Sequence, residues 1–220
     1  MATSGTTAFS LDLAEILEEA HELAGLDYRT GWQFKTGRRA LDLLLIEWGN
    51  RGYNLWAIDQ ESTTMTASTA TVTLTAATVD VIEANVVVSS TEYPMRRIPA
   101  VDYMKIPNKT STGRPNSYWI DRQLAGPTMY LWPTPDQAYT LKYWRLRRLE
   151  DTGGATYTPD IPYRFIPALT AGLAYRLAMK NPEAASRLAS LEAEYEKQWL
   201  LASEEDRDKA GFYVRPAIGR

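Results

Sequence analysis

The chain has 220 residues, a formal net charge of −3 at pH 7, one histidine and no cysteine. A folded chain of this length can bury about 70% of its unfolded surface, whereas the acidic balance argues against a dedicated nucleic-acid-binding protein, which needs a basic face. The lack of cysteine excludes disulfides, thiolate nucleophiles and zinc–cysteine sites. Because there is neither a basic leader nor an apolar run of roughly 18 residues, we expect a soluble protein without membrane contact.

The N-terminal region predicts two helices. The first, over residues 11–24, repeats apolar residues at helical spacing and ends at Gly25. Asp12 and Glu15 have the spacing of a capping box, so we expect them to cap this helix. The second helix is predicted over residues 36–48, with Leu41, Leu44, Leu45 and Trp48 on one face. It is expected to stop at Gly49, Asn50 and Gly52.

Beyond Ser62 the hydrophobic period changes to two, which is typical of strands, and threonines at 71, 73 and 75 alternate with Val72 and Leu74. Further strands are predicted over residues 86–88, 93–98, 117–122, 128–132 and 139–149. The loops 124–127 and 133–138 contain the Gly, Pro and Asp that turns require, so the last three strands predict an antiparallel meander. A proline-bounded excursion over residues 99–115 precedes this meander.

Helical periodicity returns after residue 160. A small-residue-rich helix is predicted over residues 165–180, with Pro167 in its first turn or at a kink. Asn181 and Pro182 have the order of an N-cap and first helical residue, and the helix that follows is predicted to extend to about Lys209. Its apolar face consists of Leu188, Leu191, Tyr195 and Trp199. Residues 211–220 contain no acidic residue and are expected to form an extended tail.

These elements predict an α+β protein in which a four-helix bundle carries an inserted antiparallel β domain. The predicted parts are residues 1–60 and 156–210 for the bundle, 61–155 for the β domain and 211–220 for the tail. No internal repeat is visible in the sequence.

The sequence offers little that resembles an enzyme. The only histidine, His21, has no cysteine, second histidine or serine motif to accompany it, and we expect a surface or interhelical role for it. The glycine pair in residues 151–155 lacks the Lys-Ser/Thr of a phosphate-binding loop, and no metal-ligand spacing appears. We therefore expect no enzymatic activity, no metal and no cofactor. A solvated acidic face is the favoured interpretation of the carboxylates Asp12, Glu15, Glu18, Glu19 and Glu22. A peptidoglycan hydrolase using Glu18, Glu19 or Glu22 is a less favoured alternative.

The segment GPTMYLWPTPDQAYTLKYWRLRRLED, residues 126–151, is rich in aromatic residues and arginine. Period-two geometry divides its cations, because Arg145 and Arg147 share a face with Leu141 and Tyr143 whereas Lys142 and Arg148 lie opposite. This division favours a protein interface over a nucleic-acid site, since arginine and aromatic residues are enriched at interfaces. The alternative is a carbohydrate-binding module in which Trp119, Trp132 and Trp144 stack on sugar rings.

Three stretches carry a family resemblance: RRALDLLLIEWGNRGYNLW (38–56), IPNKTSTGRPNSYWIDRQLAGPTMYLWPTPDQAYTLKYWRLRRLED (106–151) and GLAYRLAMKNPEAASRLASLEAEYEKQWLLASEEDRDKA (172–210). In this order they resemble the adaptor proteins of tailed bacteriophages, the head-completion or tail accessory factors that bind beneath the portal. The resemblance implies a helical bundle with a β insertion and no enzymatic task. It also implies a ring of identical copies at the head–tail junction of the virion, about twelve by family resemblance, made in the host cytoplasm.

The expected partners of such a ring are the portal protein above, neighbouring copies, a tail or nozzle protein below, and genomic DNA that passes without sequence-specific binding. Met129 and Leu131 are expected to fill the core while Tyr130 and Trp132 point outward as anchors. The subunit or tail interface is predicted to include Trp119, Tyr130, Trp132, Arg145 and Arg147. The C-terminal tail is predicted to bind the portal through Phe212, Tyr213, Val214, Arg215, Pro216 and Ile218.

Overall fold

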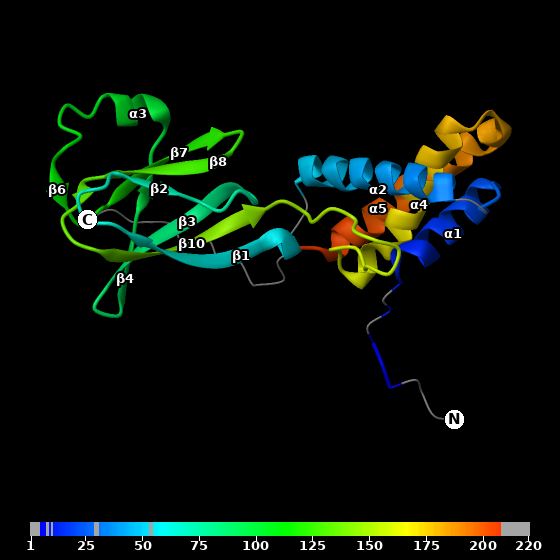
Figure 1. Ribbon diagram of the computed structural model, residues 1–220, viewed down its shortest axis with the longest axis horizontal. Helices are drawn as coiled ribbons and strands as arrows, with labels where there is room; N and C mark the ends of the chain where they lie inside the picture. The colour runs from blue at the N-terminus through cyan, green and yellow to red at the C-terminus, as the bar shows by residue number, and fades with distance from the viewer. Residues whose placement is uncertain (1–4, 8, 10, 29–30, 53–54, 208–220) are drawn as a thin grey trace, which may run out of the picture. The chain divides into compact units, whose positions relative to one another are not determined.

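The computed structural model describes residues 5–7, 9, 11–28, 31–52 and 55–207 (Figure 1). These residues form a mixed α+β fold, as the sequence predicts. The chain divides into two compact units. The helical unit contains the residues up to Leu55 and from Glu150 onward, and the β unit is Trp56–Leu149.

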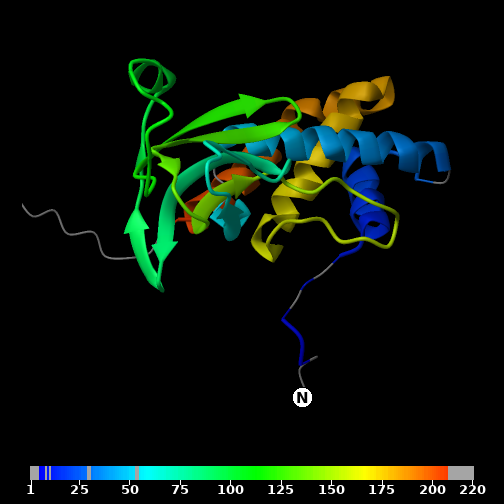
Figure 2. The same cartoon turned by 60° about the vertical axis from the view of Figure 1, so that its left-hand side comes forward.

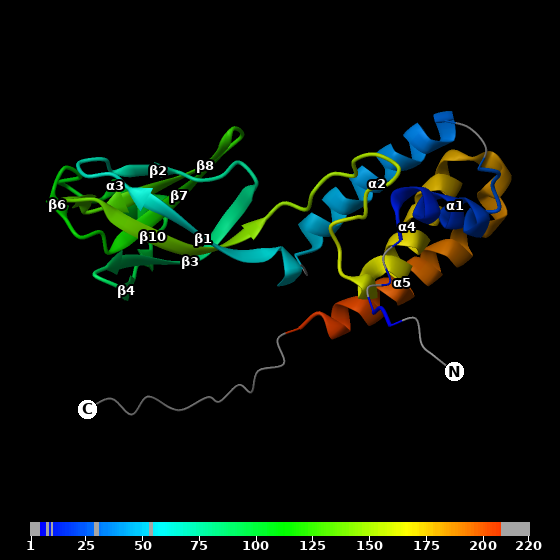
Figure 3. The same cartoon turned by 60° about the horizontal axis from the view of Figure 1, so that its bottom comes forward.

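The helical unit is organised around its third long helix. Its helices are α1 (Leu13–Ala24), α2 (Gly31–Arg51), α4 (Ile166–Lys180) and α5 (Leu188–Glu205), with short 3-10 helices η2 (Tyr163–Phe165) and η3 (Pro182–Arg187). Helix α4 packs against α1, α2 and α5 (Figure 3). It is buried almost all round, and its small residues let the neighbouring helices approach closely. The four-helix-bundle arrangement itself stays a prediction.

Helix α1 begins and ends where local sequence signals predict. The Asp12 side chain accepts a hydrogen bond from the Glu15 amide, and the Glu15 carboxylate accepts one from the Asp12 amide, both at 2.9 Å. This capping box satisfies two amides that have no partner within the helix. Gly25 closes the helix in the left-handed region, at φ 72°. The predicted capping role of Asp12 and Glu15 is confirmed.

The other helix boundaries differ from the prediction. Helix α2 continues through Gly49 and Asn50 to Arg51, because an exposed glycine costs a helix only about 1 kcal/mol and the Glu47–Arg51 pair supports the last turn. Asn181 does not cap α5, since its side-chain amide donates instead to the Leu177 carbonyl at 2.8 Å. Pro182 therefore begins η3, and α5 ends at Glu205 rather than near residue 209. Pro167 lies in the first turn of α4, as predicted.

The β unit contains two four-stranded sheets that enclose one core. One sheet has the order β1-β10-β3-β4, the other has the order β2-β8-β7-β5, and β6 pairs with β9. Side chains from both large sheets form a single hydrophobic cluster that includes Val86, Tyr118, Met129 and Leu141. In Figures 1 and 2 the β3–β4 hairpin projects away from the β7–β8 sheet. The strands are β1 (Ile58–Met65), β2 (Thr71–Thr73), β3 (Thr78–Val88), β4 (Thr91–Pro94), β5 (Arg96–Arg97), β6 (Thr112–Gly113), β7 (Ser117–Gln123), β8 (Gly126–Trp132), β9 (Thr134–Pro135) and β10 (Tyr139–Arg147).

The predicted three-stranded meander is wrong. Strands β7 and β8 form the expected antiparallel hairpin, but β10 crosses to the other sheet and lies between β1 and β3. Pro133 and Pro135 have no amide hydrogen, so the segment after β8 cannot continue a ladder beside it. From its place in the opposite sheet, β10 points Leu141 and Tyr143 into the shared core.

Two register shifts between β3 and β10 explain why most of β3 cannot be predicted from the sequence. This strand extends over Thr78–Val88, although only residues 86–88 were predicted. Register shifts opposite Trp144/Arg145 and Leu146/Arg147 place Val81 and Ala84 on the same buried face although they are three residues apart. The apolar alternation is therefore broken in the sequence although the strand is continuous.

The excursion over residues 99–115 is not a plain loop. It contains the short helix α3 (Ala100–Met104) and strand β6, which pairs in parallel with β9. Both elements precede the β7–β8 hairpin in the chain.

Candidate interaction surfaces

Three aromatic rings form a cluster on the outer face of the β7–β8 hairpin. Trp119 of β7 stacks on Tyr130 of β8 with ring centroids 4.8 Å apart. Tyr103 of α3 lies 5.6 Å from each of them. Period-two alternation produces this face, because Met129 and Leu131 point into the core and are fully buried. The predicted division of β8 into a core face and an outward aromatic face is confirmed.

The segment before β7 partly covers this aromatic face. The Trp132 indole donates a hydrogen bond to the Asn108 carbonyl at 3.1 Å, and the Thr134 hydroxyl donates to the Lys109 carbonyl at 3.1 Å. The Lys109 ammonium lies 5.6 Å from the centroid of the Tyr103 ring. Trp119, Tyr130 and Trp132 are consequently half-buried. Part of the surface of these three side chains thus stays accessible for a contact.

The aromatic residues of the sugar-binding alternative do not share a face. Trp119 and Trp132 belong to the β7–β8 sheet, whereas the exposed Trp144 belongs to β10 in the other sheet. Outer faces of two packed sheets point in opposite directions. These three rings therefore cannot form one stacking platform.

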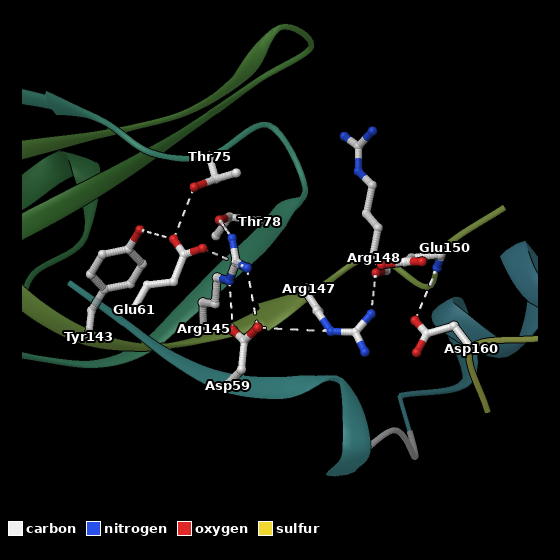
Figure 4. A network of polar contacts seen from close by, with 10 residues as sticks. All are labelled: Asp59, Glu61, Thr75, Thr78, Tyr143, Arg145, Arg147, Arg148, Glu150 and Asp160. Atoms are coloured by element: carbon white, nitrogen blue, oxygen red, sulfur yellow. Dashed lines mark hydrogen bonds and ion pairs between the residues drawn. The ribbon is translucent and has the colours of Figure 1, made fainter. Parts of the chain in front are cut away.

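Arg145 of β10 is the centre of a polar network with strand β1. Its Nε donates to Asp59 Oδ1 at 2.7 Å, its Nη2 lies 2.7 Å from Glu61 Oε1, and its Nη1 donates to the Thr78 hydroxyl at 3.2 Å. In Figure 4 its guanidinium lies between the two carboxylates. The antiparallel register brings them together by pairing Asp59 with Arg145.

Tyr143 extends this network by one more hydrogen bond. Its hydroxyl donates to Glu61 Oε2 at 2.7 Å, and the Thr75 hydroxyl donates to the same oxygen at 2.9 Å. Burial, and then the neighbouring Glu61 carboxylate, raise the pKa of Tyr143 well above its usual range. The hydrogen bond from Arg145 lowers the pKa of Asp59, and the same bond raises the pKa of Arg145. The network thus favours the charged forms of Asp59 and Arg145.

The two arginines predicted for an interface differ in exposure. The Arg145 side chain is only 8% exposed, and its charge is compensated within the β unit. The Arg147 side chain is 20% exposed, lies 3.9 Å from Asp59 Oδ2 and donates to the Arg148 carbonyl at 3.3 Å. Their predicted shared face with Leu141 and Tyr143 agrees with this burial. The interface role of all five predicted residues stays a prediction, and Arg145 has the least surface available for it.

A second network in the helical unit was not predicted from the sequence. Trp48 Nε1 donates to the Tyr195 hydroxyl at 2.9 Å, and that hydroxyl donates to Glu47 Oε1 at 3.1 Å. Glu47 also pairs with Arg176, and Arg51 bridges Glu47 at 2.7 Å and Glu196 at 3.0 Å. The i,i+4 spacing of Glu47 and Arg51 was the only local signal for it.

Ionisation of this network follows from its contacts. Burial by itself would raise the pKa of Glu47, but hydrogen bonds from Arg176 and Arg51 outweigh burial and hold that pKa below its usual range. Burial raises the pKa of Tyr195 to about 12. Glu47 is therefore ionised and Tyr195 is protonated near neutral pH, which is the combination that the hydrogen bonds require.

The residues of the hydrolase alternative lie apart from any site. Glu18, Glu19 and Glu22 are exposed on the outward side of α1. His21 is 3% exposed, so the interhelical expectation holds rather than the surface one. Its Nδ1 is 2.7 Å from the Leu17 carbonyl, and its ring centroid is 4.9 Å from that of Tyr28.

Within the described part of the chain, no group of three or more potential ligand residues could hold a metal ion. Among the helices in that same part, none is long and apolar enough to cross a membrane. The predicted portal-binding residues Phe212, Tyr213, Val214, Arg215, Pro216 and Ile218 lie outside the described residues.

Residues 11–217 match the SU10 adaptor protein family. The match covers most of the chain, and the chain therefore belongs to this family of phage structural adaptors. Membership implies association with phage portal and tail components and a place at the head–tail junction of the virion. No curated protein matches the chain.

Proposed function

We propose that this protein is a head-to-tail adaptor that assembles as a ring on the portal, extends the DNA channel and provides the docking platform for tail proteins. The observation that carries this proposal is the family match over residues 11–217. The resemblance of residues 38–56, 106–151 and 172–210 to tailed-phage adaptors supports the same role independently of any fold argument.

A ring subunit must present two different surfaces to its neighbours and further surfaces to the portal and the tail. The aromatic face of β7 and β8, with Trp119, Tyr130 and Trp132, is a rigid candidate for one of them, because aromatic anchors held in place lose little entropy on binding. Arg147 lies at the partly exposed end of β10. About twelve copies are expected from the family resemblance.

Ring closure is expected to depend on the portal. Copies with a net charge of −3 repel one another, and a template that fixes their rotation favours a closed ring over an open chain. The same charge favours passage of DNA over tight binding, so contacts with duplex should be weak and independent of sequence. We also propose that residues 211–220 bind the portal, with Phe212, Tyr213 and Val214 in apolar grooves and Arg215 paired with acidic groups.

Electron microscopy of the purified protein, alone and mixed with its portal protein, tests the proposal. We expect single copies or loose oligomers of the free protein and a closed ring beneath each portal in the mixture. The adaptor function is wrong if the portal remains without bound protein at concentrations well above the dissociation constant of a typical protein complex. Closed rings of the free protein would retain the function but contradict the template role of the portal.

A further inference from the structure

Helix α2 has an apolar stripe on each of two opposite sides. The stripe that faces the unit interior includes Leu41, Leu44 and Trp48, all fully buried. The outward stripe contains Trp32, Leu43 and Ile46, which are 69%, 53% and 61% exposed. Residues 32, 39, 43 and 46 lie on one side at 3.6 residues per turn. A helix that is apolar on both sides is typical of one with a neighbour on both sides.

A groove lies against the outward side of α2. It has a volume of about 870 Å³, and its walls include Trp32, Arg39 and Leu43 of α2 together with Leu177 and Lys180 of α4. Asp27 and Glu183 also line it. The size is that of a site for several side chains. Its walls therefore combine exposed apolar surface with two cations and two carboxylates.

The two cations of the groove have no acidic partner among the described residues. Arg39 donates only to the Lys35 carbonyl, at 3.4 Å. Burial, and then the positive charges of Arg39 and Arg176, hold the pKa of Lys180 below its usual range. Asp27 and Glu183 balance the formal charge of the groove, but Arg39 and Lys180 remain able to pair with a carboxylate from outside it.

The outward side of α5 has the complementary composition. Leu200 and Leu201 are 56% and 55% exposed, and Glu204 lies one turn after Leu200. Glu196, one turn before Leu200, already pairs with Arg51 at 3.0 Å. Lys197 is the only cation of α5, and it pairs with Glu194 at 3.4 Å. Two adjacent leucines thus lie among glutamates.

We propose that the outward face of α5, with Leu200 and Leu201, docks in the α2 groove of the neighbouring copy in the ring. The leucines cover Leu43 and Trp32, and Glu204 approaches Arg39 and Lys180. The two surfaces differ, which makes the contact heterologous, as a cyclic ring requires. A helix placed in an apolar groove is a common mode of recognition. This inference rests on the proposed ring, and it specifies which faces of the helical unit form it.

Because this chain contains no cysteine, engineered thiols are the only thiols that it carries. The double variant Leu43→Cys with Leu200→Cys is assembled on the portal and treated with a short bis-maleimide. We expect a ladder of covalent oligomers on a denaturing gel. An equal mixture of the two single variants should stop at the dimer, and each single variant alone should remain monomeric. The matched control Leu23→Cys with Leu200→Cys places one thiol on α1, 41% exposed at the native leucine and outside the groove, and should give no ladder.

The outcomes separate this inference from the adaptor function. Portal complexes that are intact by electron microscopy but give no ladder from the double variant overturn the α2–α5 contact and leave the function standing. Dimers from Leu43→Cys alone would indicate a two-fold contact between α2 helices, and an adduct of that variant with the portal protein would assign the groove to the portal. Either result overturns the proposal. If no variant and no wild-type protein binds the portal, the ring and this contact are both wrong.

Discussion

Replacing Gly172 by alanine should destabilise the helical unit although alanine is the better helix former. Gly172 lies in the middle of α4, among the buried residues of that helix. A Cβ at this position would lie 2.7 Å from Cε2 and 2.9 Å from Cδ2 of Tyr195, and 3.1 Å from Cδ2 of Leu44. The ring of Tyr195 must therefore shift if the variant is to fold.

The size of the effect depends on whether that ring can move. Alanine improves helix propensity by about 1 kcal/mol, whereas overpacking a core costs about 1–3 kcal/mol. The Tyr195 hydroxyl is held between Trp48 at 2.9 Å and Glu47 at 3.1 Å, so a shift also weakens hydrogen bonds of about 0.5–1.5 kcal/mol each. We expect a net loss of about 1–2 kcal/mol, which lowers the thermal midpoint by about 2–8 °C.

Urea unfolding followed by far-ultraviolet circular dichroism measures this loss, because the long helices belong to the helical unit. Gly49→Ala is the matched control. Gly49 lies within α2, and a Cβ there would have no atom within 4 Å, so this variant should be more stable by up to about 1 kcal/mol. The two glycine-to-alanine changes should thus move the midpoint in opposite directions.

A Gly172→Ala variant as stable as the wild type would refute the reasoning that hydrogen bonds fix the Tyr195 ring. A second comparison uses Tyr195→Phe as the background, where the ring has lost its hydroxyl anchor. There the cost of Gly172→Ala should be smaller than in the wild type, and an unchanged cost would assign the penalty to Leu44 instead.

Three other predictions follow from the networks and the tail. Arg145→Met should lower the free energy of unfolding of the β unit by about 1.5–3 kcal/mol in urea, because it removes charge-assisted hydrogen bonds to Asp59 and Glu61. The control Arg147→Met should lower it much less, and equal losses would contradict the central role of Arg145. The folded-state pKa of Glu47 is depressed, so its contribution to stability is present above the ordinary glutamate pKa and is lost as pH falls through the folded-state value. Glu47→Gln should therefore flatten the acid side of the stability–pH curve. An unchanged slope would contradict this prediction. Deleting residues 211–220 should leave the thermal midpoint almost unchanged and sharply reduce co-purification with the portal, an effect that Phe212→Ala with Tyr213→Ala should largely reproduce; undiminished binding would assign portal contact to other surfaces.

Elements governed by local signals could be predicted from the sequence. The start and end of α1 depend on Asp12, Glu15 and Gly25, which act within a few residues of themselves. The β7–β8 hairpin similarly depends on a short loop and regular alternation. Such signals need no knowledge of distant contacts, and the structure agrees with them.

Elements governed by distant partners could not be predicted from the sequence. The pairing of β10 with β1 and β3 involves strands more than 50 residues away, and nothing in the sequence near β10 specifies it. The irregular register of β3 removes the period-two pattern on which strand prediction depends. Arg145 was correctly assigned to the face of Leu141 and Tyr143, but its carboxylate partners on β1 could not be identified without that pairing.

Helix α2 has apolar residues on two sides, which makes its amphipathic pattern difficult to recognise in the sequence. Its buried stripe was readable because Leu41, Leu44, Leu45 and Trp48 follow helical spacing. Its second stripe was not recognised because apolar residues on both sides reduce the contrast between faces on which amphipathic prediction relies. Burial of Trp32, Leu43 and Ile46 could stabilise a complex but not the isolated chain, in which they are exposed. The residues that weaken the helix signal are thus those that best indicate a partner, and α2 is the first place to look for the neighbour in the ring.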